Sequence, residues 1–373
     1  MSEKYSLSGR IDNYEFELID AIKPVTSKPS GTLIGVKSGT LTWDGTTDLK
    51  LTGSLDVVGT PLLHNKYIRV YYVSTIPFAK TFGGVTWKTY RYLLGTCYAD
   101  TESGHYENGK YSGTVSLRGT LARYLDDKST KVITMGKGTK IVEFTKKVLS
   151  WYGGQYSITG LTDRKTSQPH VWDFGTSPYE IVATLAAFVN GYISCDRSGV
   201  LTISKYVEHA KRPVTYTYPT GSDSVTLSGI DIESTQGGAV NRVVVQYTKR
   251  ETYSQNGKTK TRDVPIYGSA SIDASNQAAK QKTGRYITYT EKLNSLKPET
   301  QKQADKRAKD ILKIEGGYSI VYTVKSLFLP VSIGQVVHFV YDKIDVDAII
   351  LSIEYTLSPG CPMTVKMKRL RKH

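Results

Sequence analysis

Alternation of apolar and polar residues with a period of two is the feature that most constrains how this chain folds. Leu49, Leu51, Leu55 and Val57 alternate with polar residues, and a similar run spans 14–18. A period of two puts one face of a strand against a core and leaves the other in solvent. Asp-Gly at 44–45 and Asn-Gly at 108–109 are typical of hairpin turns. With further strands at 67–73, 90–96 and 111–118, this pattern predicts a first β-barrel over residues 1–125.

The middle of the chain changes to a helical period. Ile141, Phe144 and Val148 lie on one helical face, and Gly-Gly at 153–154 ends that helix. Ser177 can cap a second helix, because Pro178 suits its first position and Gly191 its end. A hairpin at 192–203 turns at 196–199. We therefore predict an α+β helix–hairpin domain over residues 126–210.

The last third returns to the strand pattern, with runs at 240–247, 318–326, 336–341, 348–355 and 363–367. Residues 249–262 are polar and contain Asn-Gly at 256–257, so we expect an exposed hairpin loop there. Residues 268–284 predict a mobile connection, and Pro298 opens a charged helix that runs to about 315. The prediction for 211–373 is a second β-barrel with a helical insertion near 298–315. The fold class is β-rich α+β, with two small tube-like β-barrels around an α/β domain.

Composition narrows the class of protein. The chain has 373 residues and a mean hydropathy of −0.32, and no apolar run approaches the roughly 18 residues of a membrane-spanning helix. The first ten residues are polar and lack the apolar segment of a signal peptide, so we expect a protein that folds in a cytoplasm. Three widely spaced cysteines, at 97, 195 and 361, argue against a disulfide framework and a four-cysteine metal site.

The charge is strongly basic. Lys and Arg outnumber Asp and Glu by 49 to 34, which gives +15 and favours an acidic partner: nucleic acid, an anionic membrane surface or an acidic protein. A basic tail closes the chain, and we consider it a partner interface; its members are Lys366, Lys368, Arg369, Arg371 and Lys372. The alternative is a solvated terminal extension. Tyr outnumbers Phe by 27 to 8, which suits half-buried strands and interfaces.

A search for catalytic motifs finds no nucleophile elbow, zinc-protease helix, P-loop or dinucleotide fingerprint. Glu102, His105 and Glu107 could perform acid–base chemistry, but the Asn-Gly that follows makes a solvated approach to a turn the better interpretation. The three aspartates at 342, 345 and 347 lack the glycine and distal glutamate of a calcium loop, which favours a polar connection. We predict no enzyme, no metal site and no cofactor.

Four stretches in order resemble a known family. They are GTLTWD at 39–44 with LTGSLDV at 51–57, the strand pair at 67–72 and 92–96, the helix–hairpin segments at 175–180 and 191–203, and LPVSIGQVV at 329–337. This order resembles the tail hub (baseplate hub) proteins of bacteriophages, of the siphophage minor tail protein type. That family is related in fold to late control protein D and to the hub domains of type VI spike proteins. The last stretch resembles the family's P-x-x-x-G-D-x-V turn, except that Gln335 stands where Asp is frequent. Residues 249–300 match little in the family.

The resemblance implies a structural role. Hub proteins of this family are trimers with two tube-like barrels per chain, so that six barrels continue a sixfold tail tube and present a threefold face to the tip. The implied partners are a second and third copy, a distal tail or tube protein, the tape measure protein, a tip, spike or receptor-binding protein, and DNA in transit. The implied location is the distal end of the tail in the virion, after assembly in the host cytoplasm.

Two other functions stay open at this point. The first is a pair of carbohydrate-binding β modules, against which the helix–hairpin unit argues. The second is a hydrolase fused to a hub, for which the chain leaves no room after the second barrel. Within the hub hypothesis, the basic excess could line the channel or match acidic surfaces on neighbouring proteins. We favour the second, because a strongly cationic channel would retard DNA.

Overall fold

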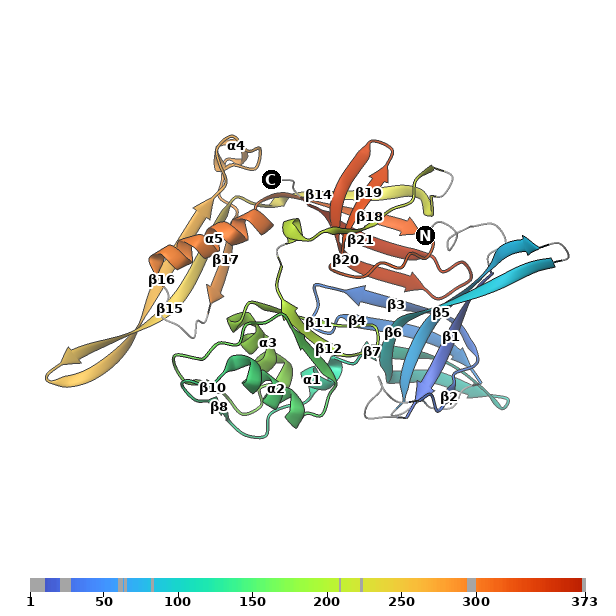
Figure 1. The fold of residues 1–373 in the computed structure, drawn as a ribbon, viewed down its shortest axis with the longest axis horizontal. Helices are drawn as coiled ribbons and strands as arrows, with labels where there is room; N and C mark the ends of the chain where they lie inside the picture. The colour runs from blue at the N-terminus through green and yellow to red at the C-terminus, as the bar shows by residue number, and fades with distance from the viewer. Residues whose placement is uncertain are drawn as a thin grey trace.

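The computed structural model describes residues 11–20, 28–59, 63, 66–81, 84–207, 209–221, 224–293 and 300–370. Its largest element is a 13-stranded sheet that draws strands from both ends of the chain (Figure 1). The neighbours in this sheet run in the order β14-β18-β21-β20-β3-β4-β7-β6-β5-β1-β2, while β19 also pairs with β20, and β13 with β19. The strands are β1 (Ile11–Ile19), β2 (Gly31–Thr32), β3 (Val36–Asp44), β4 (Leu51–Val58), β5 (Tyr67–Thr81), β6 (Gly84–Glu107), β7 (Lys110–Gly119), β13 (Val214–Thr217), β14 (Thr226–Val240), β18 (Gly317–Ser326), β19 (Val336–Tyr341), β20 (Ile344–Thr356) and β21 (Met363–Arg369).

One antiparallel pair joins the two ends of the chain. On β3 and β20, Leu41 lies opposite Tyr355 and Trp43 opposite Ile353, and all four are buried. A single hydrophobic core therefore runs under the strands of both halves. The predicted β-rich class is confirmed, and the strands expected in two barrels meet in one curled sheet.

Side-chain contacts also join strands of this sheet that are not neighbours in its hydrogen-bond ladder. The Tyr14 hydroxyl of β1, in the N-terminal half, donates to the Thr356 carbonyl of β20, in the C-terminal half, at 3.1 Å. Within the C-terminal half, the Gly229 amide of β14 donates to the Tyr341 hydroxyl of β19 at 3.2 Å. The sheet is therefore curled, so that strands distant in its order approach one another.

The helix–hairpin unit follows the prediction closely. It consists of α1 (Ala122–Asp126), β8 (Ile133–Met135), α2 (Ile141–Trp151), β9 (Tyr156–Thr159), β10 (His170–Trp172), α3 (Pro178–Phe188), β11 (Gly191–Cys195) and β12 (Leu201–Lys205), and the 3-10 turn η2 (His209–Lys211) comes after it. Ser177 Oγ accepts from the Glu180 amide at 3.2 Å, and a Glu180 carboxylate oxygen accepts from the Ser177 amide at 3.3 Å. This capping box fixes the start of α3. The unit has its own core, separate from that of the large sheet.

Residues 242–315 form a projecting element that we call the arm (Figure 1). It contains β15 (Arg242–Gln255), β16 (Lys258–Ser271), α4 (Lys280–Thr283), β17 (Thr288–Leu293) and α5 (Gln301–Glu315). The loop predicted at 249–262 is wrong: β15 and β16 stay paired up to Gln255 and Lys258, and only Asn256 and Gly257, both at positive φ, form the turn. Strands that are polar on both faces carry no hydrophobic alternation, so the sequence pattern concealed them.

The connection expected at 268–284 is also structured. Gly268 belongs to β16, and Ala278 and Ala279 are fully buried. The Asn241 amide group donates to the carbonyls of Ala278 and Arg285. These contacts hold the segment against the root of the arm.

The charged helix is present, but it begins at Gln301. Thr300 caps it in a capping box with Gln303, and Pro298 lies outside the described residues. A Cβ at Gly268 would lie 2.1 Å from the carbonyl carbon of Ala304, so glycine is required for α5 to approach β16 this closely.

Candidate assembly interface

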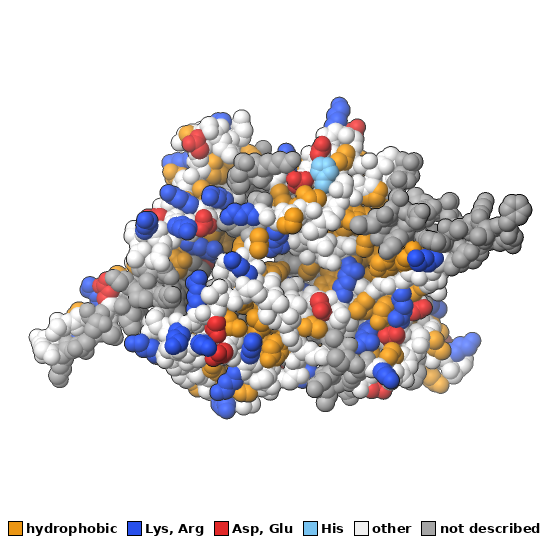
Figure 2. Space-filling view, viewed as in Figure 1, with side chains coloured by type: hydrophobic (Ala, Val, Ile, Leu, Met, Phe, Trp, Pro, Cys, Tyr) orange, Lys and Arg blue, Asp and Glu red, His pale blue; other side chains and the backbone are white. Residues whose placement is uncertain are grey.

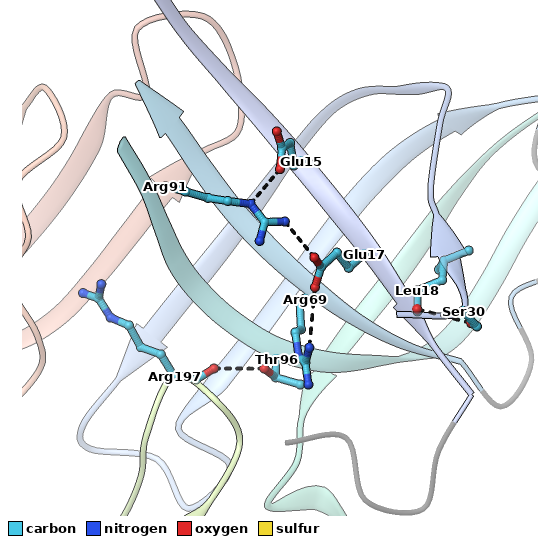
Figure 3. A network of polar contacts seen from close by, with 8 residues as sticks. All are labelled: Glu15, Glu17, Leu18, Ser30, Arg69, Arg91, Thr96 and Arg197. Atoms are coloured by element: carbon cyan, nitrogen blue, oxygen red, sulfur yellow. Dashed lines mark hydrogen bonds and ion pairs between the residues drawn. The ribbon is translucent and has the colours of Figure 1, made fainter. Parts of the chain in front are cut away.

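Arg197 joins the helix–hairpin unit to both halves of the large sheet. It lies in the turn between β11 and β12, and its Nη2 donates to the Val331 carbonyl at 2.6 Å and to the Tyr355 hydroxyl at 3.3 Å. Its Nη1 donates to the Leu93 carbonyl at 3.4 Å, and its own carbonyl accepts from Thr96 Oγ1 at 3.0 Å (Figure 3). One side chain therefore ties three parts of the fold together. Burial raises the pKa of Tyr355, so its hydroxyl stays protonated near neutral pH. The oxygen of that hydroxyl accepts the hydrogen bond from Arg197.

Two further contacts support the same junction. The Tyr179 hydroxyl on α3 donates to Asp48 Oδ1 at 2.9 Å, and burial followed by this carboxylate raises the pKa of Tyr179. Thr120 Oγ1 donates to the Gly199 carbonyl at 2.8 Å. Gly199 has φ of 91°, and a Cβ there would lie 2.6 Å from Thr120 Cγ2, so the turn must carry glycine.

The side of the large sheet opposite its core is polar across both halves of the chain; we call it the polar face. Strand register places its members on one side, and none of them is buried. Hydroxyl side chains predominate, with a few charges. The members are Thr40, Thr42, Thr52, Ser54, Asp56, Thr114, Ser116, Thr323, Lys325, Ser352, Glu354, Thr364, Lys366 and Lys368.

The basic tail is part of this sheet. β21 pairs with β18 on one side and β20 on the other, and Met363, Val365 and Met367 enter the core. The alternative of a solvated terminal extension is therefore wrong for 363–369. Lys366 is exposed and Lys368 half-buried, and both belong to the polar face, whereas Arg369 has the opposite parity at the end of the strand. Arg371 and Lys372 lie outside the described residues.

A charged ladder crosses β1, β5 and β6, also away from the core (Figure 3). Arg91 donates through Nε to Glu15 at 2.7 Å and through Nη2 to Glu17 at 2.9 Å. Arg69 Nη1 lies 3.5 Å from the other oxygen of Glu17. The Arg91 guanidinium also lies 3.5 Å from the centre of the Tyr71 ring. Because the Arg91 guanidinium bridges two carboxylates and also stacks on a ring, this ladder is firmer than an ordinary surface ion pair.

The large sheet has three terminal strands among the described residues, and β13, which pairs only with β19, is one of them. The other two are β14, which pairs as a strand only with β18, and β2, which pairs only with β1. Leu227 and Ile232 on β14 are 40% and 57% exposed. An unpaired edge with exposed apolar side chains is a surface that natural proteins usually cover.

The residues considered for chemistry lie apart from any common site. His105 Nε2 lies 3.7 Å from a Glu107 oxygen, but both side chains are more than 70% exposed near the hairpin end. Asp342 is in the turn between β19 and β20, while Asp345 and Asp347 are in β20. Sequence reasoning missed His338, whose Nδ1 lies 2.9 Å from Asp347 Oδ1; a two-residue turn at 342–343 would have placed the two residues opposite each other. Across the ranges that the structure describes, no three His, Cys, Asp or Glu side chains gather as a metal site.

The three cysteines are free thiols. Burial raises the pKa of Cys97 to about 12 and that of Cys195 to about 12. Such thiols stay protonated and unreactive near neutral pH. Among the described helices, none combines the length and the apolar character that a membrane crossing requires.

The whole chain is similar to solved tail proteins. A tail protein from Neisseria meningitidis superposes with a TM-score of 0.63 at 13% identity, over 96% of this chain and 97% of that one. The 43 kDa tail protein of prophage MuSo2 from Shewanella oneidensis gives 0.61 at 15%, over 96% and 98%. Prophage tail protein gp18 from Listeria monocytogenes gives 0.53 at 10%, over 96% and 95%. No protein-family model and no curated protein matches the sequence.

These likenesses extend through both halves of the sheet, the helix–hairpin unit and the arm, since nearly all of each chain is covered. The fold is therefore that of phage tail and baseplate hub-like proteins, as the sequence resemblance predicted.

Proposed function

We propose that this chain is a structural hub subunit of a phage tail, and that three copies close into a ring between a sixfold tube and a threefold tip. The similarity of fold to tail proteins supports this role. So does the architecture of the sheet, in which the strands of two all-β halves stand side by side across the β3–β20 pair. The domain limits that we propose are 1–125, 126–210 and 211–373, although α1 (Ala122–Asp126), at the first of these limits, packs in the core of the helix–hairpin unit.

The observation that carries the proposal is the pairing of β3 with β20. It holds the N-terminal and C-terminal strands in one sheet, so the polar face continues from one half to the other. Three copies of a chain with two such halves present six similar surfaces around one axis. A threefold assembly can thus match a sixfold tube.

We assign the polar face to the wall of the channel. Short hydroxyl side chains offer weak, exchangeable contacts, and Lys325, Lys366 and Lys368 are accompanied by Asp56 and Glu354. Such a surface lets tape measure protein and DNA pass without tight binding. In this arrangement, Lys366 and Lys368 contact the passing chain, while the larger basic excess lies elsewhere, on the arm.

The free edges support assembly with other copies and with neighbours. β14 exposes Leu227 and Ile232, and a ring closed by further chains would cover them. The proposed neighbours are a distal tail or tube protein on one side and a tip, spike or receptor-binding protein on the other. The proposed location is the distal end of the virion tail, after assembly in the host cytoplasm.

The proposal includes no catalytic activity. His105 and Glu107 are exposed. Asp345 and Asp347 pair with His338 on a neighbouring strand, far along the chain from those two residues. This arrangement supports a structural role over a hydrolase. The alternative of a carbohydrate-binding module pair predicts a stable monomer that binds glycans.

Light scattering on the purified chain tests the ring. The expected mass is three times the 41.4 kDa of one chain. The measurement is repeated at rising concentration, up to about millimolar. A mass of one chain throughout, together with specific binding on a glycan array, would replace the hub by the carbohydrate module.

A further inference from the structure

The arm carries more than half of the net positive charge of the chain. Residues 242–315 contain sixteen Lys and Arg against eight Asp and Glu, so they contribute +8 of the +15. On the side shown in Figure 2, Lys and Arg side chains gather over α5 and the root of the arm. The arm is thus the part of the molecule to which an acidic partner would be attracted most strongly.

Four lysines form a straight row on α5, which we call the lysine ridge: Lys302, Lys306, Lys309 and Lys313. At 100° per residue they fall within about 60° of one another, over about 16 Å of helix. All four are exposed, and none lies within 4.0 Å of a described carboxylate. Two other charges of α5 face the sheet of the arm: Arg307 pairs with Glu291 of β17 at 3.2 Å, and Asp305 accepts from the Ser269 amide of β16 at 3.3 Å.

The hairpin of the arm also lacks support beyond its root. The small core of the arm comprises Val243, Val245, Ala308 and Ile311, and the outermost residue packed against it on β15 is Tyr247. Eight further residue pairs follow, from Thr248 opposite Pro265 to the turn, which is about 26 Å of two-stranded ribbon. A ribbon of two strands alone is marginally stable in water, so a partner that packs on it would order it further.

We propose that the arm docks on an acidic face of another protein, with the lysine ridge as the electrostatic contact and the distal hairpin packed beside it. A row of carboxylates at i, i+4, i+7 and i+11 of a partner helix would match the ridge in spacing and sign. A second copy of this chain is a poor match, because the rest of the chain outside the arm carries +7 itself.

Nucleic acid matches the arm less well. The exposed ring of Tyr286 already has the Arg242 guanidinium at 4.2 Å and Lys280 Nζ at 4.5 Å from its centre. Tyr253 has the Arg262 guanidinium at 5.6 Å. A ring with a cation over one face has only its other face free for stacking on a base. The ridge itself contains only lysine, which lacks the forked geometry with which arginine grips phosphate.

Two synthetic helical peptides of equal composition test this inference on the full-length protein. One carries four Glu on a single face at i, i+4, i+7 and i+11, and the other distributes them around the helix; a 24-base-pair DNA duplex is the third probe. The first variant combines Lys302→Glu, Lys306→Glu, Lys309→Glu and Lys313→Glu. The control reverses four exposed lysines of the helix–hairpin unit with the same change in net charge: Lys128→Glu, Lys131→Glu, Lys137→Glu and Lys146→Glu.

We expect the one-face peptide to bind wild type and control about tenfold more tightly than the ridge variant at low salt, since each exposed ion pair adds little and four act together. We also expect it to bind better than the distributed peptide. Equal binding of the two peptides, or equal losses in both variants, would overturn the inference. If the duplex binds more tightly than the one-face peptide and loses affinity only in the ridge variant, the site is for nucleic acid and the inference is wrong. Light scattering on the same variants shows separately whether the ring persists, so failure of the docking site and failure of the hub stay distinguishable.

Discussion

Replacement of Arg197 by alanine is the change that should most clearly separate the helix–hairpin unit from the large sheet. The substitution removes donors to the carbonyls of Val331 and Leu93 and to the hydroxyl of Tyr355. Hydrogen bonds from a charged donor contribute about 1.5–3 kcal/mol each, and a buried carbonyl left unpaired costs about 1–3 kcal/mol. Because the junction is only partly buried, we expect a loss of about 2–3 kcal/mol in the free energy of unfolding.

Urea denaturation followed by circular dichroism measures this loss. Arg164→Ala is the matched control, since Arg164 is exposed on the same unit; a change within about 0.5 kcal/mol is expected there. Arg197→Lys should recover only part of the loss, because an ammonium cannot reach the separate acceptors of the planar guanidinium. If Arg197→Ala uncouples the helix–hairpin unit from the large sheet, its single unfolding transition should also split into two. If Arg197→Ala unfolds like Arg164→Ala in a single transition, the junction does not couple the parts.

Three further predictions concern the arm, the core and the charged ladder. Gly268→Ala should detach α5, because its Cβ would overlap the helix backbone; hydrogen exchange in 301–315 should accelerate strongly, while Gly31→Ala, with open space around it, should leave exchange unchanged. Cys97, with its pKa raised to about 12 by burial, should make stability fall as pH rises from about 8.5, because the unfolded chain then loses a proton that the folded chain keeps. Cys97→Ala should make that alkaline decline shallower in urea titrations, although Cys195 continues to contribute to it, and an unchanged slope would contradict the assignment. Arg91→Ala should cost about 1 kcal/mol in low salt and less in 1 M NaCl; a cost independent of salt would show that packing on the ring, and not charge, holds the ladder.

The sequence predicted most of the elements that bury one face. Strands such as 51–58 and helices such as 178–188 show their period directly, and Ser177 with Glu180 marks the helix start. The resemblance predicted the fold of the whole chain, although its individual motifs are short and imperfect. The periodicity of each segment and the order of the segments along the chain were sufficient to predict these elements and the fold.

Other features depend on contacts between distant residues, which a single sequence does not display. The β3–β20 pair joins residues about three hundred positions apart, and nothing in either strand identifies the other. Arg197 looks like an ordinary turn residue until the sheet is folded around it. The distal hairpin of the arm, predicted as a loop at 249–262, was missed because its strands are polar on both faces. The basic tail was correctly expected to begin as a strand, but its place between β18 and β20 required the sheet.

Electron microscopy of the purified chain is the most direct test of whether three copies close into a ring, through class averages viewed along the symmetry axis. We expect rings of three protomers with six similar lobes around an open channel. The polar face of the sheet should line that channel. Particles with a single protomer or two protomers, or rings whose polar face points outward, would contradict this expectation.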